Sequence, residues 1–273
     1  MEQQWILHLK DITYTYPDGT LALDKLHVKI PKGKKTVFLG PNGSGKSTTF
    51  LHMNGLLKPQ KGEIYYEGQN LSHKARKNLW KKVGIVFQDA DTQLFSTNVY
   101  QEISFGPKNL GFSNEETKKR VEEAMKATNV FNLQHKPVHF LSGGEKKRVS
   151  IADILAMDTE VVLLDEPTMS LDPKHTAELM EILEKLHQKG KTLVLSTHDV
   201  NLAYSWGDYF YIMKKERVLL EGTHEDVFSQ RELLEEANLE VPLILEIYQH
   251  LLERGKVKAL HPPRNKEELL KYL

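Results

Sequence analysis

Cysteine is absent from the 273 residues, which excludes disulfides, thiolate chemistry and cysteine-ligated metal sites. The 12 histidines form neither an HExxH pair nor a histidine-rich tract, so a structural metal site is not expected. Lysine and arginine together number 37, as do aspartate and glutamate, so no overall charge points to nucleic acid or to an acidic substrate.

Long apolar runs are also missing. The chain has no run of about 18 apolar residues, the length that crosses a bilayer. Its first residues, MEQQWILHLKD, lack the basic segment and long apolar segment of a secretory signal. We therefore expect a soluble intracellular protein, which a partner would have to hold at any membrane. Its length suits one large domain, or one domain with a small appendage.

Alternating apolar runs and helical patterns predict an α/β fold. Compact apolar runs indicate buried parallel strands at 36–40, 83–88, 161–167 and 192–199. Helical patterns occupy 45–57, most of 90–155, and 174–190. Beta-rich runs with turn signals precede residue 40, and 209–222 has the pattern of a hairpin. We expect a parallel-sheet core with an inserted helical lobe, followed from about residue 225 by a separate helical piece.

Helix ends are marked at three places. Ser113 with Glu116 has the spacing of a capping box. Asn265 with Glu268 is expected to cap a last short helix, and Gly255 can close the helix before it.

A glycine-rich loop, GPNGSGKST, follows an apolar strand and opens a helix. Its glycines let backbone N–H groups face phosphate oxygens, and the helix N-terminus adds its positive dipole end. Lys46 would reach the β- and γ-phosphates, and the Ser47 hydroxyl would bind Mg²⁺. The alternative, a chance glycine turn, is disfavoured by this strand–loop–helix context. The expected nucleotide-binding residues are Gly40, Pro41, Asn42, Gly43, Ser44, Gly45, Lys46, Ser47 and Thr48.

Two adjacent acids end the apolar run VVLLDE. Asp165 would reach the rim where the phosphates lie and is suited to holding Mg²⁺. Glu166 is placed to polarise a water for in-line attack on the γ-phosphate. The alternative is that both are ordinary acids at a strand end.

Gln88 and His198 also end predicted strands, whose carboxyl ends converge on one edge of a parallel sheet. The amide of Gln88 could coordinate the metal or the attacking water, and the imidazole of His198 could bind the γ-phosphate. Each residue alone fits an ordinary loop equally well, but together they support a catalytic site. Tyr16 could stack on adenine, although Tyr14 and Tyr16 also fit the alternation of a strand.

A second small-residue loop, LSGGEKKR, begins at Leu141. Ser142, Gly143 and Gly144 precede a helix expected near Glu145, which makes a second anion cradle. One ATP carries one triphosphate, which the first loop already wraps. Either the second loop is a simple N-cap, or it serves a nucleotide bound to another copy. In the latter case, two chains arranged head to tail form an isologous dimer around two ATP molecules.

Six motifs in order resemble those of the nucleotide-binding subunit of ABC transporters, over about residues 5–225. They are GPNGSGKST, Gln88, LSGGEKKR, LLDEP, SLD and STHD. The resemblance implies a P-loop NTPase fold with a RecA-like parallel-sheet core, an antiparallel β subdomain and an inserted helical subdomain at about 90–155. It implies an ATPase domain at 1–225 and a C-terminal helical extension at 226–273.

The same resemblance assigns roles at the interface between two copies. It implies that Ser142, Gly143 and Gly144 contact the partner's ATP, and that Asp172 links the two sites. Glu145 and Lys147 depart from the glutamines most often found at these positions. Because both lie beyond the phosphate-contacting residues, we expect tuned rather than lost activity.

A finer resemblance is to the ATPases of energy-coupling-factor (ECF) transporters, which take up metal ions or vitamins. It is carried by residues 88–111, 149–157 and 237–255. The cobalt and nickel systems are the nearest match, with vitamin uptake as the alternative. This resemblance implies ATP and Mg²⁺ as cofactors, and a second ATPase subunit that is identical or homologous. It also implies integral membrane coupling and substrate-binding subunits, and a peripheral place on the cytoplasmic face of the cell membrane.

A rival class is a soluble ABC ATPase that acts on nucleic acid or ribosomes. Its DNA-repair members need long coiled-coil insertions, and its translation-factor members carry two cassettes in one chain. Neither feature is present, so no nucleic acid partner is expected.

Two apolar surfaces leave alternatives open. Gln93, Leu94 and Phe95 could form a socket for a helix of a membrane partner, or Leu94 and Phe95 could pack the lobe's own core. In the tail, one helical face could cover the chain's own sheet or form a second dimer contact. That face is expected to consist of Leu243, Ile244, Ile247, Leu251 and Leu252.

Overall fold

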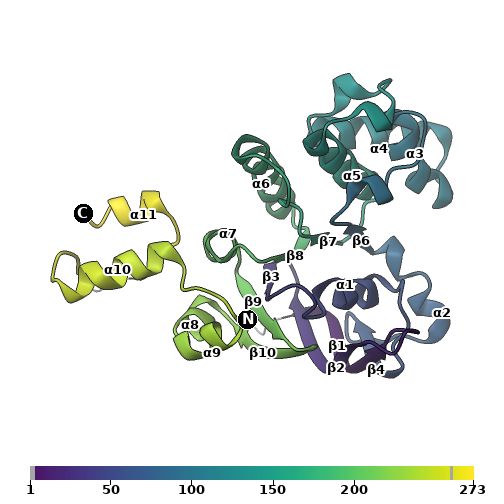
Figure 1. Ribbon diagram of the computed structural model, residues 1–273. Helices are drawn as coiled ribbons and strands as arrows, with labels where there is room; N and C mark the ends of the chain where they lie inside the picture. Colours follow the sequence, from purple (N-terminus) through teal and green to yellow (C-terminus); the bar gives the residue numbers. More distant parts are fainter. Residues whose placement is uncertain (1–3, 259–260) are drawn as a thin grey trace.

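A six-stranded sheet forms the centre of the computed structural model, which describes residues 4–258 and 261–273 (Figure 1). Its strands are β3 (Lys35–Leu39), β6 (Val83–Val86), β7 (Val161–Asp165), β8 (Thr192–Thr197), β9 (Tyr209–Lys214) and β10 (Arg217–Gly222). They lie in the order β10-β9-β3-β8-β7-β6. All neighbouring strands are parallel except β9 and β10, which form the expected hairpin. The predicted parallel-sheet core is confirmed.

The central strands are buried on both faces, as their uninterrupted apolar runs predict. Every residue of β7 and β8 is buried. Because these strands are parallel, their carboxyl ends meet at one edge. Gly40 follows β3, Asp165 ends β7 and His198 follows β8 at that edge. The fold therefore brings together residues that are far apart in the sequence.

A four-stranded antiparallel sheet packs on one face of the core. Its strands are β1 (Trp5–Thr15), β2 (Leu21–Pro31), β4 (Lys61–Tyr66) and β5 (Gln69–Asn70), in the order β2-β1-β4-β5. Leu9 and Val28 from this sheet share a buried cluster with Phe38 of β3 and with Phe50 of α1 (Lys46–Asn54). On the opposite face, α6 (Pro173–Gln188) and α7 (Val200–Trp206) contribute to a second buried cluster.

The helical lobe leaves the core after β6 and returns before β7, as Figure 1 shows. It has its own buried cluster, which includes Val99, Val121 and Val149. Its helices are α3 (Val99–Asn109), α4 (Asn114–Ala127) and α5 (Gly143–Ala156), with the 3₁₀ turns η2 (Ala90–Thr92), η3 (Phe131–Leu133) and η4 (Val138–Phe140). A short helix α2 (His73–Arg76) and the turn η1 (Leu79–Lys81) precede β6.

The tail consists of α8 (His224–Phe228), α9 (Arg231–Glu236), α10 (Leu243–Glu253) and α11 (Lys266–Leu270). Figure 1 shows α10 and α11 standing beside the core rather than over its central sheet. Among the described residues, no helix has both the length and the apolarity to cross a bilayer.

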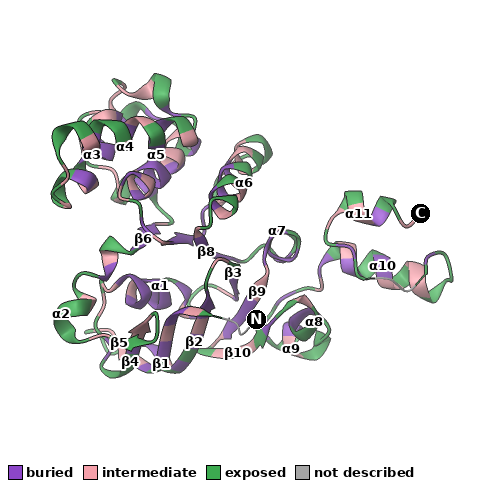
Figure 2. Cartoon of the chain, turned by 180° about the vertical axis from the view of Figure 1, so that it is seen from behind, coloured by how far each residue is buried: buried purple, intermediate pink, exposed green. Residues whose placement is uncertain are grey.

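The tail differs from the single apolar face that the sequence predicts. Ile244 packs against both the core and a small cluster around Tyr248, and Leu251 and Leu252 join that cluster. Leu243 and Ile247 are instead exposed. Figure 2 shows that α10 carries both buried and exposed segments. The five predicted residues are divided because α11 folds back on one side of α10 only.

Several helix and strand ends also differ from expectation. α1 ends at Asn54 rather than near residue 57, because Gly55 takes a left-handed C-cap with φ of 88°. β6 ends two residues before Gln88. Ser113 does cap α4, but the Glu116 carboxylate pairs with Arg120 instead of completing a capping box. The expected Asn265 cap and the closing Gly255 are confirmed.

Candidate functional site

The first glycine loop connects β3 to α1, as expected, and two of its three positive-φ glycines also have no room for a side chain. Gly40 has φ of +149°, and an added Cβ would lie 2.2 Å from the Met213 carbonyl oxygen. Gly45 has φ of +98°, and an added Cβ would lie 2.7 Å from the Ala22 carbonyl oxygen. Close backbone approach and left-handed geometry therefore both require glycine here.

Lys46 is buried within the loop that it follows, at 6% exposure. Its Nζ donates to the carbonyl oxygens of Gly40 (2.8 Å) and Pro41 (3.1 Å). Burial lowers the pKa of Lys46, and the nearby Glu166 carboxylate opposes that shift. These contacts hold the ammonium at the mouth of the loop, where a phosphate oxygen could replace the carbonyls.

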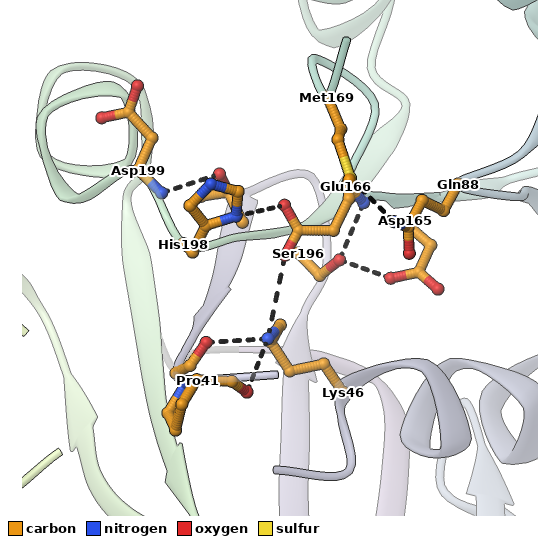
Figure 3. Close-up of polar contacts among 11 residues, drawn as sticks. Pro41, Lys46, Gln88, Asp165, Glu166, Met169, Ser196, His198 and Asp199 are labelled. Carbon is orange, nitrogen blue, oxygen red and sulfur yellow. Dashed lines mark hydrogen bonds and ion pairs between the residues drawn. The ribbon is translucent and has the colours of Figure 1, made fainter. Parts of the chain in front are cut away.

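Asp165 and Glu166 are joined by a residue that the sequence reasoning missed, Ser196 of β8 (Figure 3). The Ser196 hydroxyl donates to Oδ1 of Asp165 at 2.6 Å and accepts the N–H of Glu166 at 2.9 Å. Glu166 has φ of +43°, a left-handed geometry that is uncommon outside glycine. Its bond to Ser196 helps to hold that backbone geometry. The position of Ser196, two residues before His198 at a strand end, was the available signal.

Glu166 lies between a lysine and a histidine. Its Oε1 is 3.8 Å from Nζ of Lys46, and its Oε2 is 3.1 Å from Nδ1 of His198 (Figure 3). The carboxylate is buried, whereas His198 is exposed. Oε1 accepts no hydrogen bond among the described residues. The group is thus fixed on one side and retains an acceptor that a water molecule could use.

Gln88 lies at the same edge but is held by contacts that the sequence did not indicate. Its Nε2 donates to Sδ of Met169 at 2.7 Å (Figure 3). Its carbonyl oxygen and that of Phe87 both accept from Nζ of Lys147, each at 2.8 Å. Burial lowers the pKa of Lys147 to about 8.

Tyr16 borders the first glycine loop, where its hydroxyl lies 3.1 Å from Oγ1 of Thr48. Stacking of Tyr16 on adenine stays a prediction. A cavity of about 340 Å³ lies beside this loop. It is lined by Tyr16, Thr20, Leu21, Ala22, Asn42, Gly43, Ser44, Gly45, Lys46, Ser47, Thr48, Gln88, Glu166 and Glu216. Sequence reasoning missed four of these residues. Thr20, Leu21 and Ala22 lie at or just before the start of β2, and Glu216 lies in the turn between β9 and β10.

The second glycine loop starts α5 as a capped helix. Oγ of Ser142 accepts from the N–H of Glu145, and the Glu145 carboxylate accepts the N–H of Ser142 at 2.7 Å. Among the described residues, Ser142–Gly144 do not line the cavity beside the first loop. Gly143 instead borders a separate cavity with Gln88 and Met169. The two anion cradles therefore do not converge on one cavity within this chain.

Asp172 is the N-cap of α6. It caps that helix through the N–H of His175 at 2.9 Å, and its Oδ2 lies 2.6 Å from Nδ1 of the His175 ring. An added Cβ on Gly144 would lie 2.9 Å from the same ring. Close packing against His175 therefore explains the glycine at 144.

The residues present suit a nucleotide triphosphate with its metal. The Ser44 hydroxyl is buried in the loop without a hydrogen-bond partner among the described residues, which a phosphate oxygen would satisfy. The Ser47 hydroxyl and the Asp165 carboxylate offer hard oxygen ligands of the kind that Mg²⁺ prefers.

The sequence pattern of one known family matches this architecture. The model of the family described as ABC transporter matches residues 23–169, more than half of the chain. The chain belongs to the ABC transporter family. A shorter match, at residues 137–203, is to a family described as AAA domain, putative AbiEii toxin, Type IV TA system.

Similar proteins match nearly the whole length of this chain, beyond the residues that the family model matches. A putative ABC transporter ATP-binding protein of Methanosarcina mazei is 44% identical over 98% of this chain, which spans 60% of that relative's length. The energy-coupling factor transporter ATP-binding protein EcfA of Methanococcus maripaludis is 44% identical over 92% of this chain and 91% of its own. The cobalt import ATP-binding protein CbiO of Rhodobacter capsulatus is 44% identical over 97% of this chain and 95% of its own length.

Solved structures agree with the fold. The cbiO1 protein of Clostridium perfringens, described as part of the ABC transporter complex cbiONQ, has a TM-score of 0.77 and 40% identity, covering 92% of this chain and 100% of its own. A bacterial ABC transporter cassette solved as a dimer has a TM-score of 0.72 and 31% identity, covering 80% and 99%. The predicted P-loop ATPase fold and the ECF-type resemblance are both confirmed. This ABC subunit is an ATP-binding ATPase whose hydrolysis is coupled to transport.

Proposed function

We propose that this subunit binds and hydrolyses ATP, with Mg²⁺, to energise an ECF-type importer for cobalt or nickel ions. The observation that most supports ATP hydrolysis is that Glu166 is held between Lys46 and His198 at the mouth of the first glycine loop. The relatives named for energy-coupling factors and for cobalt import support the transport assignment, because the likeness includes the tail. Vitamin uptake by an ECF transporter is the alternative cargo class.

The proposed chemistry assigns a role to each side chain at the site. Lys46 exchanges its bonds to the Gly40 and Pro41 carbonyls for bonds to phosphate oxygens. Ser47, Asp165 and the amide of Gln88 would hold the metal, which would supply positive charge to the phosphate oxygens. Glu166 orients the attacking water and accepts its proton, while His198 fixes the carboxylate and contacts the γ-phosphate.

The dimer supplies what one chain lacks in this proposal. Ser142, Gly143 and Gly144 would close over the γ-phosphate bound by the partner subunit, and Asp172 would link the two sites. The separation of the two glycine loops into different cavities supports this arrangement. The partner is a second copy or a close homologue.

A membrane subunit would dock beside the loop of Gln88. Phe95 is 66% exposed, and its ring packs edge to face on that of Phe105 at 4.9 Å. Leu94 packs against the lobe's own buried cluster instead. Leu94 therefore fits the packing alternative, whereas Phe95 is free to contact a partner. An exposed aromatic pair beside the link between core and lobe favours a partner surface. Docking there would place the subunit peripherally on the cytoplasmic face of the cell membrane.

Uptake measurements in cells test this proposal. The chain is expressed together with candidate membrane subunits of an ECF-type transporter from the same organism, and accumulation of Co²⁺, Ni²⁺ and a vitamin is measured. We expect energy-dependent metal uptake that Phe95→Glu abolishes, together with loss of co-purification, while ATPase activity of the purified variant stays within about twofold of the parent.

The matched control is Phe140→Glu, because Phe140 is equally exposed at 68% but lies on another turn of the lobe. That variant should assemble and transport as the parent does. Metal uptake that persists without the chain would contradict the transport proposal, and loss of vitamin uptake alone would select the alternative cargo.

A further inference from the structure

Lys147 makes an unusual set of contacts for a buried lysine. It is 3% exposed on α5, and its ammonium donates to two consecutive carbonyls, those of Phe87 and Gln88, at 2.8 Å each. Within residues 4–258 and 261–273 it forms no ion pair. Hydrogen bonds from a charged donor are about twice as strong as neutral ones, so these two bonds hold the carbonyls firmly.

The two carbonyls lie where the chain leaves the core. β6 ends at Val86, and the next residues lead into the lobe. α5 carries the return path, which enters the core again at β7. Figure 1 shows the two connections, one that leaves the core after β6 and one that returns from α5 to β7. The two hydrogen bonds from Lys147 of α5 tie the outgoing connection to the helix of the return path.

The same contact joins two functional segments. α5 begins at the second glycine loop, so Lys147 lies about one helical turn beyond Ser142–Gly144. Gln88 is the side chain that the proposed function places at the metal. Its side chain reaches Met169, in the segment that follows Glu166. A neighbouring ion pair, Lys146 with Asp91, runs parallel to this link, but Asp91 is solvent-exposed and such pairs contribute little.

We propose that Lys147 is a positioning residue that locks the backbone of Gln88 to the helix of the second glycine loop. The amide at one ATP site and the cradle offered to the partner's ATP then move as one body. This inference rests on the proposed function, because it uses the roles given there to Gln88 and to Ser142–Gly144. Lys147 itself does not line the cavity beside the first glycine loop.

Spin labels report the link directly, because a chain without cysteine accepts a unique pair. Lys58→Cys in the core and Lys118→Cys in the lobe replace two exposed lysines. Their distance distribution is measured in the parent, in Lys147→Met and in Lys147→Arg. Methionine retains an unbranched apolar chain without donors, and arginine retains the charge and several donors.

The proposal expects a shifted or broadened distribution for Lys147→Met and a parent-like distribution for Lys147→Arg. It also expects the kcat for ATP to fall about tenfold in Lys147→Met with KM changed less than about twofold, and to recover in Lys147→Arg. The bound ATP per chain, counted at saturation, should stay at the parent value. A merely structural role would instead lower the bound ATP per chain and leave the distances in the folded chains unchanged.

Lys108→Met is the matched control, since Lys108 is an exposed lysine of the same lobe. It should leave both distances and rates at parent values. Parent-like distances in Lys147→Met would overturn the positioning role while leaving the proposed function intact. If the parent itself hydrolysed no ATP, the proposed function would fail, and the label distances would still decide whether Lys147 holds the lobe.

Discussion

Glu166→Gln is expected to lower the rate of ATP hydrolysis by roughly 1,000-fold, within the range that a positioned general base contributes. The amide keeps the size of the side chain but cannot accept a proton from water. ATP binding should persist, because Lys46 and the loop backbone are unchanged. Because unhydrolysed ATP holds the first glycine loop of one chain against the second glycine loop of its partner, the variant should also accumulate as a dimer when ATP is present. Hydrolysis, bound nucleotide and mass in solution are measured on the same sample.

Glu160→Gln provides the control for this change. Glu160 precedes the strand that Glu166 follows, and its carboxylate pairs with Lys82 and accepts from Tyr66. The Glu160→Gln substitution therefore removes a carboxylate at the opposite end of β7, away from the first glycine loop. Hydrolysis should stay within about twofold of the parent. If Glu166→Gln hydrolysed ATP as fast as the parent, the assignment of the base would be wrong.

Gly143→Asp should affect folding and catalysis in opposite directions. Gly143 is the first residue of α5, and an added Cβ there meets no atom within 4 Å. A carboxylate in the first turn of a helix is stabilising, so the free energy of unfolding should be unchanged or higher by up to about 1 kcal/mol. The same charge faces the partner's γ-phosphate in the proposed dimer, so hydrolysis should fall roughly 100-fold.

Gly143→Ala separates the effect of charge from that of bulk. It adds a methyl group at the same exposed position without a charge, and it should remain at least about tenfold more active than Gly143→Asp. Thermal or denaturant unfolding supplies the stability of each variant. Parent-like hydrolysis in a well-folded Gly143→Asp would show that this loop does not face a phosphate.

The central part of the site could be predicted because its chemistry imposes local patterns. A loop that wraps phosphate needs glycine at strained positions, and Gly40 and Gly45 are indeed the ones with positive φ and no room for a side chain. Metal-binding acids at the end of a buried parallel strand need an apolar run ending in a carboxylate, which Asp165 satisfies. Such patterns are short and can be read without knowledge of tertiary contacts.

Other contacts depend on which distant segments the fold brings together. Ser196 bridges Asp165 and Glu166 because β7 and β8 are neighbours in the sheet, and its strand-end position alone does not say which strand lies beside β8. The sequence marked Lys147 only as an unusual residue after the second loop. Its carbonyl partners are 60 and 59 residues away, so its role appears only when the lobe is folded against the core.

The tail shows the limit of periodicity alone. A helical repeat identifies apolar positions but not what covers each of them. Leu251 and Leu252 are covered by the turn and helix that follow, which leaves Leu243 and Ile247 exposed. A contact between two copies in the absence of ATP, one of the two alternatives for this face, would involve those two residues.

The rate of ATP turnover per chain, measured across a dilution series with the mass determined at each concentration, tests the shared pocket most directly. If the partner donates the second cradle, dilution to free single chains must suppress turnover, and concentration must restore it until every chain is paired. A sample that sediments wholly as single chains, yet turns over ATP at its maximal rate per chain at every dilution, would contradict the account.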